Sequence, residues 1–560
     1  MTQSRDPVTP ALRAALRGTT GVVLASTTVN LLMLNGSIYM MQIYDRVLVS
    51  RSPSTLVTLS ALVFGLFAVQ GVLDALRQRL MVRIADGFAE MLRGPAHAAA
   101  MRLAASGATR AAAAPEQDVE RVRTVLAGAG PTALVDLPFA VLFMALIFAI
   151  HPALGATALG GGVVLILLPV LSGRLSRAAA DAALRGTAQR VGEAETHRRN
   201  AESARVMGFV GRLRDRSLAA AAAASAAELT VADVGGAFAA TARTVRMALQ
   251  SALLGLGAWL AIHDAVSSGA FLACSALVGR ALAPVDLAIA HWRGFGEARA
   301  ALRRLRDGLR APDDARTRLP TPVARLAVEG LSVTPPGLAR PVVAGVDFAL
   351  EAGDVLAVVG PSGAGKSSLA RALVGAWPAA TGAVRLDGAR LDQWDAEDLG
   401  RHIGWVAQSV GFFDGTIAEN IARMDPAAPA EAVIAAARAA GIHEMILRTP
   451  QGYDTRIGDA QGPLSTGQRQ RLALARALYG EPFLLVLDEA NSNLDAAGEA
   501  ALVRAIAAAR ARGAIVVVVT HRTNLISAAN RILVVEDGAV KAFGPRDEVV
   551  RLPTPAVRAA

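Results

Sequence analysis

Apolar residues gather in the first half of the chain, in runs that are too long for ordinary strands. Each run holds about 20 residues, which is roughly the helical length that the hydrocarbon core of a bilayer requires. We therefore predict six membrane-spanning helices, near residues 22–44, 54–76, 132–150, 153–172, 245–263 and 268–288. The start of the third span is the least sharply defined, because Asp136 interrupts the apolar pattern there.

The connections between these spans alternate between short and long. Short links lie near residues 45–53, around His151 and at Asp264–Gly269, whereas residues 77–131 and 173–244 form long, polar loops with a helical pattern. Many arginines fall in the long loops, and positive residues favour the cytoplasmic side of a membrane. We expect both long loops and both chain termini to lie in the cytoplasm.

The pattern changes after a Pro-rich linker, and short β-rich runs then alternate with helical segments. This alternation predicts an α/β domain. Strands are expected at Leu326–Val333, Val342–Leu350, Val355–Val359, Leu484–Leu487 and Ile515–Thr520, and a helix from Lys366. The predicted fold is a polytopic α-helical membrane domain with six transmembrane helices, fused to a C-terminal α/β domain. Its predicted parts are a cytoplasmic tail at 1–18, the membrane domain at 19–310, a linker at 311–322 and the α/β domain at 323–560.

Composition supports a membrane protein. The mean hydropathy is +0.39, and 53% of residues are hydrophobic against 19% charged, which excludes disordered and collagen-like chains. The net charge of +10 fits the cytoplasmic arginines. Nucleic-acid binding is the competing explanation, but only 4% of residues are aromatic and no basic stripe is interleaved with them, so we expect no nucleic-acid partner. The lone Cys274 permits no intrachain disulfide.

Polar residues inside the predicted spans need a partner, because lipid cannot satisfy them. Asn30, Asn35 and Arg280 are therefore expected to face the interior of the helix bundle or a water-filled path. Interhelical hydrogen bonding is the simpler interpretation for the two asparagines. For Arg280, reaching back to the cytoplasmic side and lining a transport path are both open.

A phosphate-binding loop follows the predicted strand Val355–Val359 and opens a helix. The glycines would let backbone N–H groups approach phosphate oxygens, while Lys366 reaches the β- and γ-phosphates and the Ser367 hydroxyl takes a Mg²⁺ position. Lys366 is one of only two lysines in the chain. The nucleotide-binding residues predicted here are Gly360, Pro361, Ser362, Gly363, Ala364, Gly365, Lys366, Ser367 and Ser368.

A second motif is the hydrophobic strand that ends in Asp488 and Glu489. After a phosphate loop, such a pair is typical of a carboxylate that holds Mg²⁺ through water and a neighbour that polarises the attacking water. We predict the first role for Asp488 and the second for Glu489.

The stretch Leu464–Arg471, with Ser465, Thr466, Gly467 and Gln468, resembles the signature sequence of ATP-binding cassette proteins. The resemblance implies ATP as substrate and Mg²⁺ as its partner. It also assigns Gln408 to the Mg²⁺-sensing loop that couples to the membrane domain.

The same resemblance assigns a loop and a histidine, and it implies an oligomeric state. It assigns Ser492–Asp495 to a subunit-crossing loop and His521 to the γ-phosphate switch. In this family the signature of one subunit contacts the ATP of the other, and one chain here carries one cassette, so a homodimer is implied. Two departures are Thr466, where glycine is usual, and the absence of an adenine-stacking aromatic in Leu331–Gly337.

Local stretches are similar to type I protein secretion exporters, namely Tyr39–Leu48, Ser50–Ser52 and Thr55–Leu56 around the end of the first span, and Gly279–Asp286 and Trp292–Gly294 at the sixth. Two further stretches resemble the alkaline-protease and S-layer branch of that group. They are Asp488–Asp495, where Ala490 replaces the usual proline, and Thr520–Arg522. The similarity implies a bacterial inner-membrane motor that passes an unfolded polypeptide with a C-terminal signal to a periplasmic adaptor and an outer-membrane tunnel. Residues 1–18 are expected to be too short for a leader-cleaving domain.

Two alternatives remain at the level of the sequence. A lipid or drug exporter of the same architecture would carry the same motor motifs. A nucleotide-gated channel or sensor without productive hydrolysis is the alternative from a different class, although Glu489 and His521 are both present for hydrolysis.

Overall fold

The structure is a computed structural model that describes residues 6–105, 114–309, 319–338, 340–458 and 464–551. The chain is divided into two compact units. One consists of Arg5–Ala99 and Ala114–Arg310, and the other is built mainly from Ala311–Ala560. We call them the helical unit and the cassette unit.

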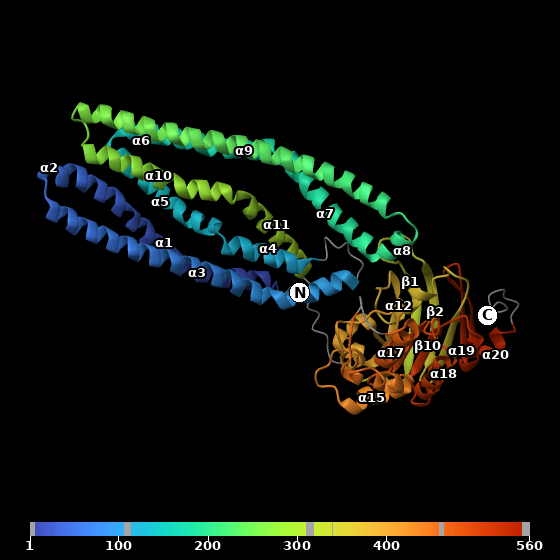
Figure 1. Cartoon of the computed structure of the whole chain (residues 1–560). Coiled ribbons are helices and arrows are strands. Elements are labelled where there is room, and N and C mark those ends of the chain that lie inside the picture. The colour runs from blue at the N-terminus through green and yellow to red at the C-terminus, as the bar shows by residue number, and fades with distance from the viewer. Residues whose placement is uncertain (1–5, 106–113, 310–318, 339, 459–463, 552–560) are drawn as a thin grey trace. The chain divides into compact units, whose positions relative to one another are not determined.

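Long helices running side by side make up the helical unit (Figure 1). Six of its helical segments are long and apolar enough to cross a membrane, as predicted. The helices are α1 (Val8–Gln42), a π-helical turn η1 (Ile43–Val47), α2 (Leu48–Ser50), α3 (Pro53–Ala105), α4 (Pro115–Ala127), α5 (Ala129–Ile150), α6 (Pro152–Leu175), α7 (Arg177–Arg199), α8 (Ala201–Val206), α9 (Val210–Ile262), α10 (Ser268–Ala290) and α11 (Trp292–Leu309).

Two apolar clusters hold the helical unit together. One joins α5, α6, α9 and α10 through side chains such as Phe143, Leu154 and Leu253. The other joins the first turns of α1 to α3, α4 and α11, and it buries Val8 and Phe88. The described part of the predicted N-terminal tail is therefore helical and packed from Val8 onward.

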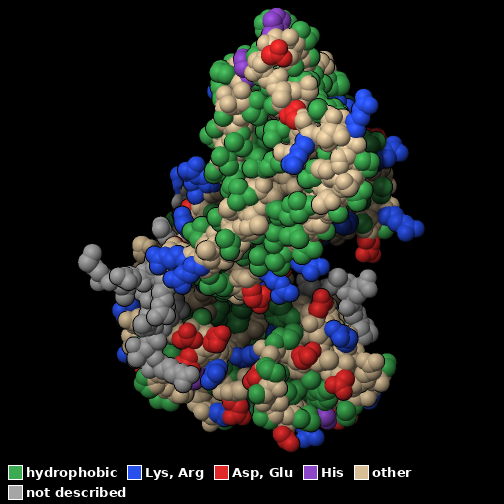
Figure 2. All heavy atoms as spheres, turned by 90° about the vertical axis from the view of Figure 1, so that its left-hand side faces the viewer, with side chains coloured by type: hydrophobic (Ala, Val, Ile, Leu, Met, Phe, Trp, Pro, Cys, Tyr) green, Lys and Arg blue, Asp and Glu red, His purple; other side chains and the backbone are tan. Residues whose placement is uncertain are grey.

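Much of the remaining apolar surface of this unit is exposed. In α3, only 6% of the most apolar window is buried inside the structure. Figure 2 shows hydrophobic side chains over much of the helical unit, seen from the end that carries α2. An apolar surface of this extent needs lipid or another protein surface to cover it.

A polar cluster ties three helices of this unit together. Arg77 of α3 donates to Asp136 of α5 at 2.8 Å, to Asp74 at 2.6 Å and to the Ser26 hydroxyl of α1 at 3.1 Å. Asn30 of α1 donates to Asp136 at 2.7 Å, as expected for an interhelical hydrogen bond. The third span begins with α5 at Ala129, earlier than residue 132, because Asp136 is paired inside the bundle rather than exposed.

The connection after α1 is clasped to the start of α10. Asp45, in the π-helical turn, accepts hydrogen bonds from the Gly269 N–H at 2.8 Å and the Ser267 hydroxyl at 2.6 Å. The carboxylate thereby satisfies a free N–H at a helix N-terminus. Two of the short connections predicted from the sequence therefore lie at the same end of the helical unit.

The described part of the cassette unit holds three sheets. One has six strands in the order β12-β11-β3-β10-β9-β6, one has four antiparallel strands in the order β2-β1-β4-β5, and the smallest is the antiparallel pair β7-β8. In the six-stranded sheet, β11, β3, β10, β9 and β6 are parallel and β12 is antiparallel to β11. All five predicted strands and the helix from Lys366 are present.

The strands are β1 (Arg325–Val333), β2 (Val343–Glu351), β3 (Val355–Val359), β4 (Thr381–Leu386), β5 (Ala389–Arg390), β6 (Ile403–Val406), β7 (Gly415–Thr416), β8 (Arg456–Ile457), β9 (Leu484–Asp488), β10 (Ile515–Val519), β11 (Arg531–Glu536) and β12 (Ala539–Pro545). The α-helices are α12 (Lys366–Leu373), α13 (Ala396–His402), α14 (Ile417–Ile421), α15 (Ala430–Ala439), α16 (His443–Leu447), α17 (Thr466–Leu478), α18 (Ala496–Ala511), α19 (Thr523–Ala528) and α20 (Arg546–Val549). Short 3₁₀ turns lie at Leu391–Gln393 and Gly452–Asp454.

Strands β3, β10 and β9 form the centre of the six-stranded sheet and are buried along their whole length. Their residues read as continuous apolar runs, which is typical of parallel strands covered on both faces. Because the strands are parallel, the segments that follow them emerge at one edge of the sheet. The phosphate loop, Glu489 and His521 each follow one of these three strands.

Candidate nucleotide-binding site

The phosphate loop connects β3 to α12 through glycines in conformations that other residues rarely adopt. Gly360, Gly363 and Gly365 have φ values of 154°, 82° and 95°. A side chain at Gly360 would collide with the Val535 carbonyl oxygen, and a Cβ at Gly365 would lie 2.6 Å from a Val343 methyl group. The glycines are therefore required by the local geometry of the loop, as the motif predicts.

Lys366 lies over this loop and is nearly buried, at 6% exposed. Its Nζ donates hydrogen bonds to the carbonyl oxygens of Gly360 and Pro361, both at 2.8 Å. Burial lowers the pKa of the Lys366 ammonium, and the nearby Glu489 and Asp488 carboxylates oppose that shift. The ammonium is held at the mouth of the loop, where a phosphate would meet it.

Ser367 and Asp488 are brought together from α12 and the end of β9. The Ser367 hydroxyl donates to Asp488 Oδ1 at 3.0 Å. Asp488 is fully buried, and its Oδ2 has no hydrogen-bond partner among the described residues. Burial raises the pKa of the Asp488 carboxyl, and the Ser367 hydrogen bond partly opposes this. A hydroxyl beside a carboxylate oxygen with unused lone pairs fits a hard cation such as Mg²⁺.

Glu489 follows Asp488 and lies beside Gln408. The Gln408 side chain donates to Glu489 Oε2 at 3.0 Å, although the two residues are far apart in the sequence. Glu489 has a φ of 51°, a left-handed conformation that is rare for a residue with a side chain. Its N–H donates to the Val519 carbonyl at 3.0 Å, which holds the backbone in place.

His521 lies two residues beyond the end of β10, next to the end of β9 because Val519 pairs with Asp488. Its side chain is exposed, and no hydrogen bond to it is found in the described residues. The preceding Thr520 is fully buried and contacts Asn491. Ser367 thus contacts Asp488 and Gln408 contacts Glu489. Lys366 is near both carboxylates electrostatically, and His521 lies at the same edge of the sheet.

The predicted signature forms the start of α17. Ser465 and Gln468 make reciprocal hydrogen bonds that cap the helix, at 2.8 and 3.3 Å. Thr466 is exposed in the first turn of the helix. Within the described ranges, no hydrogen bond links the signature residues to the phosphate loop. Asp495, at the start of α18, is bound by Arg471 at 2.7 Å.

Sequence reasoning missed Gln470, which is buried on α17. Its side chain contacts the backbone of the loop that begins with Glu489. Its place within the signature stretch Leu464–Arg471 was a signal that could have drawn attention to it. The partner loop could not be inferred from that signal alone.

Arg280 lies in the middle of α10, and its guanidinium is close to Gly36 of α1. In the part of the chain that the structure describes, it makes no ion pair or hydrogen bond. Its two proposed roles stay predictions.

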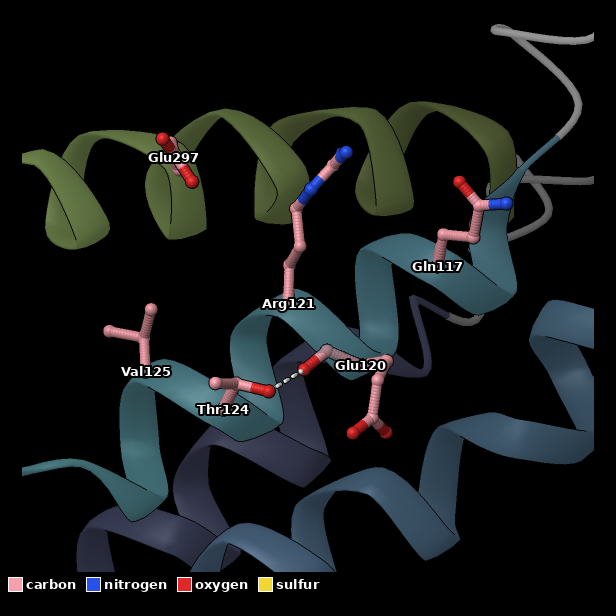
Figure 3. A pocket seen from close by; sticks show the side chains of 6 residues that line it. All are labelled: Gln117, Glu120, Arg121, Thr124, Val125 and Glu297. Carbon is pink, nitrogen blue, oxygen red and sulfur yellow. Dashed lines mark hydrogen bonds between the residues drawn. The ribbon is translucent and has the colours of Figure 1, made fainter. Parts of the chain in front are cut away.

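A shallow pocket in the helical unit is separate from these residues. Figure 3 shows its lining from α4 and α11, where the Thr124 hydroxyl donates to the Glu120 carbonyl at 2.9 Å. Arg121 and Glu297 supply opposite charges, and the pocket contains none of the residues predicted to act on a nucleotide.

Comparison with known proteins identifies the class. Residues 343–492 match the ABC transporter family, and residues 20–284 match the ABC transporter transmembrane region. The fold is similar to that of a bacterial Atm1-family ABC exporter with ATP bound, with a TM-score of 0.82 and 21% identity over 97% of each chain. These matches identify a multi-pass ABC transporter that has the fold of an ABC exporter and whose cassette binds ATP.

Curated relatives narrow the class. The chain is 46% identical to the type I secretion system ATP-binding protein PrsD of Rhizobium meliloti, over 98% of this chain and 94% of that one. It is 30% identical to the cyclolysin secretion/processing ATP-binding protein CyaB of Bordetella pertussis, over 94% of this chain and 75% of that one. The toxin RTX-I translocation ATP-binding protein of Actinobacillus pleuropneumoniae is also 30% identical, over 78% of this chain and 62% of that one. The chain belongs to the ATP-binding cassette transporters of type I protein secretion.

Proposed function

We propose that two copies of this chain form the motor that exports an unfolded polypeptide in a type I secretion system. The observation that carries this proposal is the 46% identity, over almost the whole of both chains, to a type I secretion ATP-binding protein. The other two relatives are named for the secretion or translocation of a cyclolysin and a toxin. Protein cargo is therefore favoured over the lipid or drug alternative.

The cassette supplies the residues that ATP hydrolysis requires. Lys366 and the N–H groups of the phosphate loop would bind the phosphates of ATP. Glu489 would accept a hydrogen bond from the attacking water and take its proton, while Gln408 orients the Glu489 carboxylate through their hydrogen bond. His521, free at the same sheet edge, would contact the terminal phosphate. Productive hydrolysis is favoured over the channel or sensor alternative because these groups share one edge of the sheet.

Ser367, Asp488 and Gln408 would hold Mg²⁺ together with the nucleotide. The hydroxyl of Ser367 and the unpartnered Oδ2 of Asp488 suit this cation. When bound, Mg²⁺ neutralises charge on the phosphate oxygens.

A homodimer is proposed because the signature of one subunit contacts the ATP of the other in this family, and this chain carries one cassette match, at residues 343–492. Ser465, Thr466, Gly467 and Gln468 would contact the ATP held by the partner subunit, and Asp495 would lie in the crossing loop between the two. The membrane would be the bacterial inner membrane, with the cassettes in the cytoplasm. A periplasmic adaptor and an outer-membrane tunnel would receive the polypeptide, which would carry a C-terminal signal.

The base role is tested with Glu489→Gln in the full-length protein in lipid nanodiscs. We expect ATP binding to persist and the hydrolysis rate to fall by about 10²-fold or more, as is typical when a general base is removed. Secretion of a cargo protein by cells that carry this variant should fall in parallel. A wild-type hydrolysis rate in Glu489→Gln would refute the assignment of the base.

A further inference from the structure

Gln470 is a buried polar residue of the signature helix α17 to which the proposed mechanism gives no role. It is 3% exposed. Its Nε2 donates to the Glu489 carbonyl at 3.0 Å and to the Ser492 hydroxyl at 3.3 Å, and its Oε1 accepts the Asn493 N–H at 3.0 Å. One side chain thus satisfies three groups of the loop that follows β9.

These partners fix the orientation of the Gln470 amide. A backbone carbonyl only accepts hydrogen bonds and a backbone N–H only donates them. Rotating the amide by 180° would place its oxygen against the Glu489 carbonyl and its NH₂ group against the Asn493 N–H. Gln470 is therefore a specific brace between α17 and the loop.

The brace acts on a backbone conformation that needs support. The left-handed φ of Glu489, 51°, is unfavourable for a residue with a side chain. Val519 of β10 accepts the Glu489 N–H on one side, and Gln470 donates to the Glu489 carbonyl on the other. The direction in which the Glu489 carboxylate points thus depends on α17 as well as on the sheet.

Close packing makes α17 and this loop a single body. A Cβ at Gly467 would lie 2.6 Å from the Asn493 carbonyl oxygen, so the helix approaches the loop at backbone distance. Ser465 caps the same helix at its start, only five residues before Gln470. A displacement of the signature end of α17 therefore shifts the partners of the Gln470 amide.

We propose that Gln470 is a positioning residue for ATP hydrolysis, which couples the placement of the signature helix to the backbone of Glu489 in the same subunit. The inference rests on the proposed role of Glu489 as the base. In the proposed homodimer, the signature contacts the ATP of the partner subunit, whereas Glu489 acts on the ATP of its own. Gln470 then couples the contact of the signature with the partner subunit's ATP to the position of Glu489 beside the ATP of its own subunit.

The first test is Gln470→Met in the full-length protein in nanodiscs. Methionine keeps the length and packing of the side chain but cannot brace the loop. We expect kcat to fall by about 10- to 100-fold through misplacement of the base. The KM for ATP should stay within about twofold, because ground-state binding does not involve Gln470.

The matched control is Asn530→Leu. Asn530 accepts the Val355 N–H and donates to Asp354, both at 2.7 Å, at the end of β3 away from the phosphate loop. The Asn530→Leu variant should lower the melting temperature at least as much as Gln470→Met does, while leaving basal ATPase activity unchanged. Equal losses of activity in both variants would show that Gln470 is merely structural, which overturns the proposal.

A double-mutant cycle with Glu489→Gln separates this inference from the base assignment. If Gln470 acts through Glu489, Gln470→Met causes no further loss when Glu489 is already replaced. Independent, multiplying losses overturn the coupling but leave the base role intact. Near-wild-type turnover in Gln470→Met alone also overturns the coupling and leaves the base role intact. Wild-type turnover in Glu489→Gln alone overturns both the base role of Glu489 and the positioning role of Gln470.

Discussion

Asp488 lies fully buried at the end of β9, with one carboxylate oxygen unpartnered in the described part of the chain. Burial raises the pKa of this carboxyl, so the folded cassette binds a proton there more tightly than the unfolded chain does. The stability of the nucleotide-free protein must then fall as the pH rises from the ordinary aspartate pKa through the raised one. The cost is therefore present at pH values above the raised pKa of Asp488.

We predict that Asp488→Asn raises the melting temperature of the nucleotide-free protein at neutral pH. Each kcal/mol recovered should add about 2–4 °C for a unit of this size. The variant should also lose the stabilisation that Mg²⁺ and ATP give the wild type, because the cation would lose a carboxylate ligand. Melting curves of the full-length protein with and without Mg²⁺ and ATP test both effects. A lower melting temperature without nucleotide would contradict this explanation.

Residue-level prediction from the sequence succeeded where spacing alone defines a motif. The loop from Gly360 to Ser367 folds around its glycines, and Ser367 meets Asp488 as the paired motifs suggest. Gln470 was missed because its partners lie about 20 residues further along the chain, and only tertiary packing brings them to α17. The roles of the site residues stay predictions until they are measured.

At the scale of elements, the cluster of Arg77, Asp136, Asp74 and Asn30 connects α1, α3 and α5. Removing one partner of a largely buried ion pair costs about 3–5 kcal/mol, since the remaining charge is left uncompensated. We predict a loss of this size for Arg77→Met, measured as thermal or denaturant stability in nanodiscs.

The reference for this prediction is the double variant Arg77→Met/Asp136→Leu. Replacing both charges by apolar side chains should recover most of the lost stability, because no isolated charge remains. If the double variant loses at least as much stability as the two single variants lose in sum, the assignment of Arg77 and Asp136 as one compensated pair is contradicted. Arg93→Met, at an exposed ion pair with Glu90, should change stability little.

Apolar periodicity predicted the existence of each helix and strand better than its ends. All six spans are present, yet α1 begins at Val8 and α5 at Ala129. Val8 is packed against α3, α4 and α11, which hydropathy along the chain cannot reveal. Asp136 made the start of the third span uncertain in the sequence, because a carboxylate interrupts the apolar pattern there. Its partner Arg77 lies 59 positions away, so the pairing could not be inferred from the local sequence.

At the scale of the whole molecule, an α-helical unit with a largely exposed apolar surface is joined to a cassette that carries the groups for ATP hydrolysis. The exposed surface is accounted for by lipid, in agreement with the ABC transporter transmembrane region that the chain matches. In the proposed homodimer, the signature of a second cassette would complete each nucleotide site. From its relatives in type I secretion, we infer that this motor exports a polypeptide.

The most direct test of that claim is the ATPase rate of the purified protein in lipid nanodiscs. It is measured with and without the C-terminal segment of a candidate secreted protein from the same genome. A scrambled segment and the Glu489→Gln variant serve as controls for nonspecific effects and contaminating ATPases. We predict a change in rate that requires the intact segment. No response to any peptide, together with stimulation by lipids or amphipathic drugs, would contradict polypeptide export.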